Sequence, residues 1–170
     1  MKTIFFGFLI FIGLFSFGAG EKTMKLTSQA FENEGMIPSL YTCDGKDIPP
    51  VLMWDSVPDG TKSLALICDD PDAPAGTWVH WVIYNINPEI KELSEKTLMQ
   101  SGAVEGINDF KKVGYGGPCP PSGIHRYFFK LYALDKKLDI NPGINKSKLE
   151  ELMKGHIILK TELIGKYKRL

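Results

Sequence analysis

Short apolar runs, each ended by Gly, Pro, Asn or Asp, recur along most of this chain. Four of them alternate in the manner of β-strands and are rich in aliphatic, aromatic and β-branched residues, over residues 63–68, 78–86, 125–134 and 157–164. The segments between them carry turn-forming sequences such as Pro-Asp-Gly and Asn-Pro-Gly. Short strands separated by such turns predict an antiparallel sandwich or barrel.

One segment near the C-terminus has the pattern of a helix instead. Ser147 and Glu150 have the spacing of a capping box, and the apolar residues that follow fall on one helical face before Gly155 ends the pattern. A second, shorter helical turn is expected over residues 93–98. The sequence therefore predicts a mostly β protein with one or two short helices.

The first twenty residues differ from the rest of the chain. Lys2 precedes an uncharged apolar run over residues 4–17, and small residues follow it up to Gly20. This order is typical of a secretory signal peptide, and the run is shorter than the roughly 20 apolar residues of a membrane-spanning helix. We predict a signal peptide over residues 1–20, one domain over residues 21–170, and export to the periplasm or the exterior; an uncleaved N-terminal anchor is the alternative.

The composition and net charge of the chain limit the kinds of molecule that it is expected to bind. The chain has 170 residues, 44% of them hydrophobic, and a formal net charge of +0. This length suits one domain with a real core. Nucleic-acid binders carry a basic excess, because neutralised phosphates supply much of their affinity, so a nucleic-acid partner is not expected.

Three cysteines follow the predicted signal peptide. Cys68 lies in an apolar run and is interpreted as a small buried hydrophobic residue, whereas Cys43 and Cys119 lie in turn-rich segments. Export permits a disulfide, and Cys43 with Cys119 is then the plausible pair.

Strand alternation places several polar side chains on inward faces. Asp70 ends the row of Leu64, Leu66 and Cys68; His80 shares a face with Val82 and Tyr84; His125 shares one with Tyr127. Each residue also has an ordinary structural interpretation: a turn-forming Asp, a hydrogen-bonded core His, a core Tyr. Their coincidence beside two loops rich in Pro and Gly, residues 70–74 and 116–123, instead favours a concave anion site.

The sequences of these two loops, and of the strand between them, resemble those of a known protein family. The segments DPDAP (70–74), WVHW (78–81) and GPCPPSGIHRY (117–127), in that order, are similar to the signature of the phosphatidylethanolamine-binding protein family, in its compact microbial branch. The resemblance implies an antiparallel two-sheet Greek-key β-sandwich and a pocket for phosphate, acetate or a phosphoethanolamine headgroup. It also implies that Asp70 and His80 form one wall and His125 and Tyr127 another, with Gly117, Cys119 and Pro120 at the rim.

The predicted function is a non-catalytic binding or regulatory module for a small anion or phospholipid headgroup. The alternative is a secreted serine-protease inhibitor, with the Pro-rich loops presented to the enzyme; a homodimer is left open. An enzyme is disfavoured because the sequence shows no activated nucleophile, no close-spaced metal ligands around Asp70, His80 and His125, and no cofactor motif. Anion affinity is predicted to fall as pH rises past about 6.5 to 7.5, where imidazoles lose their charge.

Overall fold

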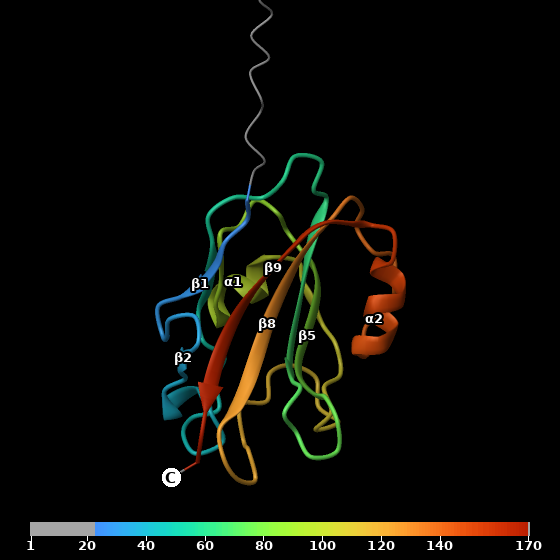
Figure 1. Cartoon of the computed structure of the whole chain (residues 1–170). Helices are drawn as coiled ribbons and strands as arrows, with labels where there is room; N and C mark the ends of the chain where they lie inside the picture. Colours follow the sequence, from blue (N-terminus) through green and yellow to red (C-terminus); the bar gives the residue numbers. More distant parts are fainter. Residues whose placement is uncertain (1–22, 170) are drawn as a thin grey trace, which may run out of the picture.

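The computed structural model describes residues 23–169 and is built around a six-stranded sheet (Figure 1). The strand order is β2-β9-β8-β4-β5-β7. The bounds are β2 Gly35–Met36, β4 Ser63–Asp70, β5 Trp78–Ile86, β7 Val104–Glu105, β8 His125–Leu134 and β9 Ile157–Tyr167. All eight residues of β4 are buried. A central strand that is covered on both faces has a continuous apolar sequence, which is the pattern of residues 63–68.

A smaller sheet and two helices cover the two faces of this large sheet. The three-stranded sheet has the order β1-β3-β6, with β1 Leu26–Ser28, β3 Leu52–Trp54 and β6 Glu92–Leu93. Helix α1 spans Glu95–Gln100, helix α2 spans Lys146–Met153, and a 3₁₀ turn, η1, spans Ser39–Tyr41. Helix α2 lies on the opposite side of the large sheet from β1 and α1 (Figure 1).

Two hydrophobic cores result from this arrangement. The larger core lies between the two sheets and includes Leu52, Trp81 and Phe129. The smaller one lies between the large sheet and α2, whose Leu149 and Met153 are buried in it. Successive residues of a strand face opposite sides, so each central strand contributes to both cores.

Strand β5 departs from strict alternation at two places. Cys68 pairs with Trp81 but Asp69 pairs with Val79, so His80 is an extra residue in a β-bulge. A second register shift lies between the pairs of Leu64 and Leu66. A bulge bends the strand and re-aims side chains, and the first of these decides where His80 points.

Several predictions are confirmed and others are corrected. The chain is mostly β with two sheets and few helices, but the large sheet is mixed, because β2 pairs with β9 in parallel. The purely antiparallel arrangement was therefore wrong, while the Greek-key connectivity stays a prediction. Helix α2 begins earlier than predicted: Asn145, not Ser147, is its N-cap, accepting a hydrogen bond from the backbone N–H of Lys148.

The predicted signal peptide over residues 1–20 lies outside the described residues. Over residues 23–169, no helix has both the length and the apolar character needed to cross a membrane.

Candidate functional site

A cavity of about 260 Å³ lies at the end of the large sheet where β4 ends and β8 begins. The loop after β4, the start of β5 and the long loop before β8 form its walls. The lining residues are Asp70, Ala73, Pro74, Ala75, Trp78, His80, Phe110, Cys119, Pro120, Pro121, His125 and Tyr127. The antiparallel pairing of β4 with β8 and β5 brings the end of one strand beside the beginnings of others, so distant polar residues meet here.

Asp70 and His125 form a buried pair in this cavity. Nδ1 of His125 lies 2.7 Å from Oδ2 of Asp70, and the two side chains are 8% and 4% exposed. The other carboxylate oxygen of Asp70 accepts from the backbone N–H of Asp72 at 2.8 Å. The Asp70 carboxylate is thus held from two sides and fixes the orientation of the His125 ring.

His80 is oriented by the backbone rather than by a carboxylate. Its Nδ1 lies 2.6 Å from the carbonyl oxygen of Gly116, and because a carbonyl only accepts, Nδ1 carries the proton. The ring packs edge-on against Tyr127 and Phe110, with centroids 5.1 Å and 5.4 Å away. Burial lowers the pKa of His80, opposed in part by the Gly116 carbonyl and by Asp70.

Tyr127 is fully buried, and its hydroxyl has no hydrogen-bond partner among residues 23–169. Burial, followed by the nearby Asp70 charge, raises the pKa of Tyr127, so the hydroxyl keeps its proton. Buried polar groups are nearly always hydrogen-bonded, and an exception at a cavity wall is a candidate for contact with a ligand.

The β-bulge corrects the predicted orientation of His80. Strict alternation would place His80 with Val82 and Tyr84, which pack on the α2 side of the sheet. The extra residue at the bulge instead turns His80 toward Tyr127, on the side of Trp81 and the larger core. Without this irregularity, the second imidazole would be directed away from the cavity.

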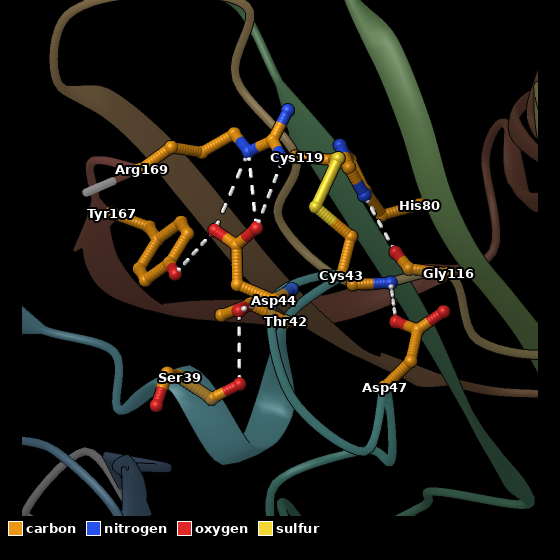
Figure 2. Close-up of a disulfide and its surroundings, with 11 residues drawn as sticks. Ser39, Thr42, Cys43, Asp44, Asp47, His80, Gly116, Cys119, Tyr167 and Arg169 are labelled. Carbon is orange, nitrogen blue, oxygen red and sulfur yellow. Dashed lines mark hydrogen bonds and ion pairs between the residues drawn. A yellow bond between two sulfur atoms is a disulfide. The ribbon is translucent and has the colours of Figure 1, made fainter.

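A disulfide crosses the rim of the cavity. Cys43 and Cys119, which the sequence left as the plausible pair without deciding whether they are bonded, form a disulfide with Cα atoms 5.4 Å apart, and Cys68 is free and buried. Figure 2 shows the disulfide close to His80 and Gly116, joining the segment after η1 to the loop before β8. The backbone N–H of Cys43 also donates to the Pro118 carbonyl at 3.1 Å.

Six of the seven predicted site residues line this cavity, namely Asp70, His80, Cys119, Pro120, His125 and Tyr127. Gly117 does not line it: it borders a smaller adjoining cavity of about 100 Å³, where its N–H donates to Asp47 at 2.6 Å. The backbone contact to a site histidine comes from Gly116.

Two aromatic residues of the cavity were not predicted as site residues. Trp78 and Phe110 lie edge-to-face, with centroids 5.4 Å apart. Trp78 stands two positions before His80, and that spacing was a signal available in the sequence. Phe110 comes from the long loop before β8, where no periodicity marks it. Over residues 23–169, no group of three or more His, Cys, Asp or Glu side chains is arranged to hold a metal ion.

The fold and the site together define a two-sheet β protein with a histidine-lined cavity at one end of its larger sheet. Comparison with known proteins makes the assignment specific. The family model described as phosphatidylethanolamine-binding protein matches residues 27–168. The chain belongs to the phosphatidylethanolamine-binding protein family.

Relatives and solved structures agree with this assignment. A UPF0098 protein of Methanothermobacter thermautotrophicus is 54% identical over 86% of this chain and 99% of its own length. The crystal structure of a phosphatidylethanolamine-binding protein homologue from Chlamydia trachomatis is 44% identical, with a TM-score of 0.83 over 88% of this chain and all of that one. Escherichia coli YbcL, described as a member of the mammalian family, is 31% identical, with a TM-score of 0.80 over 86% of this chain and 99% of that one.

Proposed function

We propose that this protein binds a small phosphate-type anion, free or as part of a phosphorylated headgroup, in the cavity beside His125, and that it acts as a non-catalytic binding module. The observation that supports this most directly is the buried Tyr127 hydroxyl, which has no partner among the described residues and lies beside two oriented imidazoles. A ligand oxygen at this point would satisfy the hydroxyl.

The two imidazoles offer the ligand complementary groups. Nδ1 of His80 is taken by the Gly116 carbonyl and Nδ1 of His125 by Asp70, so Nε2 of each ring is the nitrogen available to a ligand. In the neutral ring Nε2 accepts, and in the imidazolium it donates. A phosphate that still carries one proton can donate to a neutral His80 and accept from Tyr127, whereas a fully ionised oxygen needs a protonated imidazole.

Apolar walls make these few polar groups more effective. Trp78, Phe110 and Pro120 line the cavity around the polar floor, so a ligand bound there would displace water from it. Hydrogen bonds and charge interactions are stronger where water is excluded. The same walls can receive the carbon portion of an organic phosphate, since ligand sites are mostly apolar with a few well-placed polar groups.

Burial of His80 changes the pH window expected from the sequence. The pKa of His80 is lowered, so its ring becomes positively charged only at a pH below the ordinary histidine value of about 6.5. An anion can be bound through that charge only in this lower pH range. Binding of inorganic phosphate through a charged His80 is therefore expected to strengthen as pH falls below that value.

Isothermal titration of the oxidised protein with inorganic phosphate and with phosphorylethanolamine tests the proposal. His80→Asn and His125→Asn each keep a donor near the Nδ1 position and remove Nε2. Loss of a hydrogen bond involving charge is expected to weaken binding by about 10- to 100-fold. The matched control is His156→Asn, because His156 forms a similar bond to Asp135, 2.8 Å long, at the other end of the sheet.

Phosphate affinity unchanged in His80→Asn and His125→Asn, or reduced equally in His156→Asn, would contradict the proposal. A preference for phosphorylethanolamine over inorganic phosphate would indicate recognition of the organic part.

Export, inhibition of serine proteases and the absence of catalysis stay predictions. Incubation of the protein with chymotrypsin-like enzymes would test the inhibitor alternative.

A further inference from the structure

We propose that the Cys43–Cys119 disulfide is an exposed thiol–disulfide exchange site, whose reduction loosens one wall of the cavity and weakens anion binding. The inference rests on the proposed function, because it needs an anion whose affinity can be regulated. It concerns the loop before β8, which supplies Cys119, Pro120 and Pro121 to the cavity wall.

The disulfide is the main tether of this part of the wall. Within residues 23–169, no hydrogen bond involves residues 119–124, and two of these residues are prolines, which have no N–H to donate. The loop is hydrogen-bonded just before this stretch, at Gly117 and Pro118, and enters β8 just after it, at His125. Between those points the bond from Cys119 to Cys43 is the covalent link that holds the stretch, Pro120 is buried, and residues 121–124 are exposed.

Both bonded cysteines are accessible to a reductant. Cys43 and Cys119 are exposed, whereas the remaining cysteine, Cys68, is buried. Thiol–disulfide exchange requires a thiolate to reach one of the two sulfur atoms, so exposed disulfides are the labile and regulatory ones. Burial raises the pKa of the Cys68 thiol well above its usual range, which makes it a poor partner for internal exchange.

The exchange needs an external dithiol, of the kind that reduces protein disulfides. One thiolate of the dithiol attacks a sulfur of the disulfide and forms a mixed disulfide, releasing the other cysteine as a thiolate, which takes up a proton. The second thiol of the reductant then displaces the remaining cysteine and closes its own disulfide. Two electrons and two protons pass to Cys43 and Cys119, and the reductant is oxidised by the same amount.

Reduction leaves the floor of the cavity in place and frees its wall. Asp70 is held by its pairing with β5, His125 and Tyr127 by their pairing with β9, and the contact between His80 and Gly116 lies upstream of the freed stretch. A ligand entering the reduced cavity must then order the wall as it binds. Ordering a mobile segment on binding lowers affinity, and we expect a decrease of about tenfold.

The experiment compares phosphate binding by the oxidised protein and by the same protein reduced with a phosphine that does not itself form adducts with thiols. Isothermal titration gives the affinity, and NMR order parameters of the backbone N–H groups of Cys119, Ser122, Gly123 and Ile124 give the mobility of this stretch. We expect reduction to weaken phosphate binding about tenfold and to lower the order parameters in this stretch, while the hydrogen-bonded amides of β4 and β8 keep their protection from hydrogen exchange. The double variant Cys43→Ser with Cys119→Ser should match the reduced protein and should not respond to the phosphine.

Equal phosphate affinity in the oxidised and reduced proteins would overturn this inference and leave the proposed function standing. Unchanged order parameters at Cys119 and over residues 122–124 would overturn it as well, because the wall would then be held by other contacts. If the oxidised protein does not bind phosphate, both proposals fail together. Far-UV circular dichroism of the reduced wild-type chain verifies that the fold is intact, independently of the double variant.

Discussion

A histidine bonded to an aspartate lies beside each end of β8, and the two pairs differ mainly in their surroundings. At one end, Nδ1 of His125 lies 2.7 Å from Asp70; at the other, Nδ1 of His156 lies 2.8 Å from Asp135. The side chains of the first pair are 8% and 4% exposed, and those of the second are 36% and 51% exposed. The same hydrogen bond thus occurs once in a buried cavity and once at the surface.

The difference shows what turns a common contact into a candidate site. The exposed pair of His156 and Asp135 has water as an alternative partner, so the hydrogen bond between them contributes little to the free energy of folding. The buried pair has no such alternative, and around it lie a second oriented imidazole and an unpartnered Tyr127 hydroxyl. The end of the sheet at His125 is therefore organised for contact with a ligand, whereas the end at His156 satisfies its own groups.

Replacement of the aspartate should give the largest difference between the two pairs, measured as the loss in free energy of unfolding. Asp70→Ala leaves Nδ1–H of His125 and the backbone N–H of Asp72 without their acceptor, and breaking a buried pair costs about 3–5 kcal/mol. Asp135→Ala breaks an exposed pair and should cost about 0–1 kcal/mol. Urea denaturation gives both free energies of unfolding. Similar losses in the two variants would show that burial does not distinguish the pairs.

Replacement of tyrosine by phenylalanine should change the free energy of unfolding in opposite directions at the buried Tyr127 and the partly buried Tyr115. The Tyr127 hydroxyl has no partner among the described residues, so Tyr127→Phe should stabilise the ligand-free fold, by up to about 1 kcal/mol, while weakening phosphate binding. Tyr115 donates to the carbonyl of Tyr41 at 2.9 Å, so Tyr115→Phe should destabilise by about 1 kcal/mol. A destabilised Tyr127→Phe variant would indicate that its hydroxyl is satisfied in the free protein.

Much of this site was predictable because strand alternation is a strong physical constraint. A strand with one face in a core must direct every second residue inward, which placed Asp70, His125 and Tyr127 correctly. The same rule failed at His80, because a bulge adds one residue to β5 and no residue type in the segment marks it. The inward position of His80 therefore depends on pairing with β4, which the sequence of β5 alone does not contain.

Loops limited the prediction in a different way. The pairing of Cys43 with Cys119 followed from the burial expected of Cys68, because an apolar strand removes that thiol from reach. Phe110 was missed because the long loop before β8 has no period, and its packing against Trp78 and His80 is a tertiary result. The parallel pairing of β2 with β9 was missed for a related reason, since a two-residue strand has no pattern to read.

The smallest expected effect concerns the exposed ion pair of Arg126 and Asp72, which lies beside the buried pair of Asp70 and His125. Arg126 binds Asp72 through two nitrogens, at 2.8 Å and 2.7 Å, and Asp72 in turn donates its backbone N–H to Asp70. The Arg126 guanidinium lowers the pKa of Asp72 to about 2. A carboxylate with a lowered pKa in the fold stabilises it above its ordinary value near 3.9, and this stabilisation is lost as pH falls toward the folded value.

Arg126→Ala should therefore lower stability above about pH 4 by a small amount, about 0–1 kcal/mol because the pair is exposed, and shift acid unfolding to higher pH, because Asp72 then protonates closer to its ordinary value. Arg126→Lys keeps the charge but loses the two-pronged contact, so its acid midpoint should fall between those of Arg126→Ala and the wild type. Circular dichroism followed from pH 6 to pH 2 measures the midpoints. Identical acid midpoints in all three proteins would mean that the exposed pair, unlike the buried pair beside it, contributes nothing to holding the loop of Asp72 over the cavity.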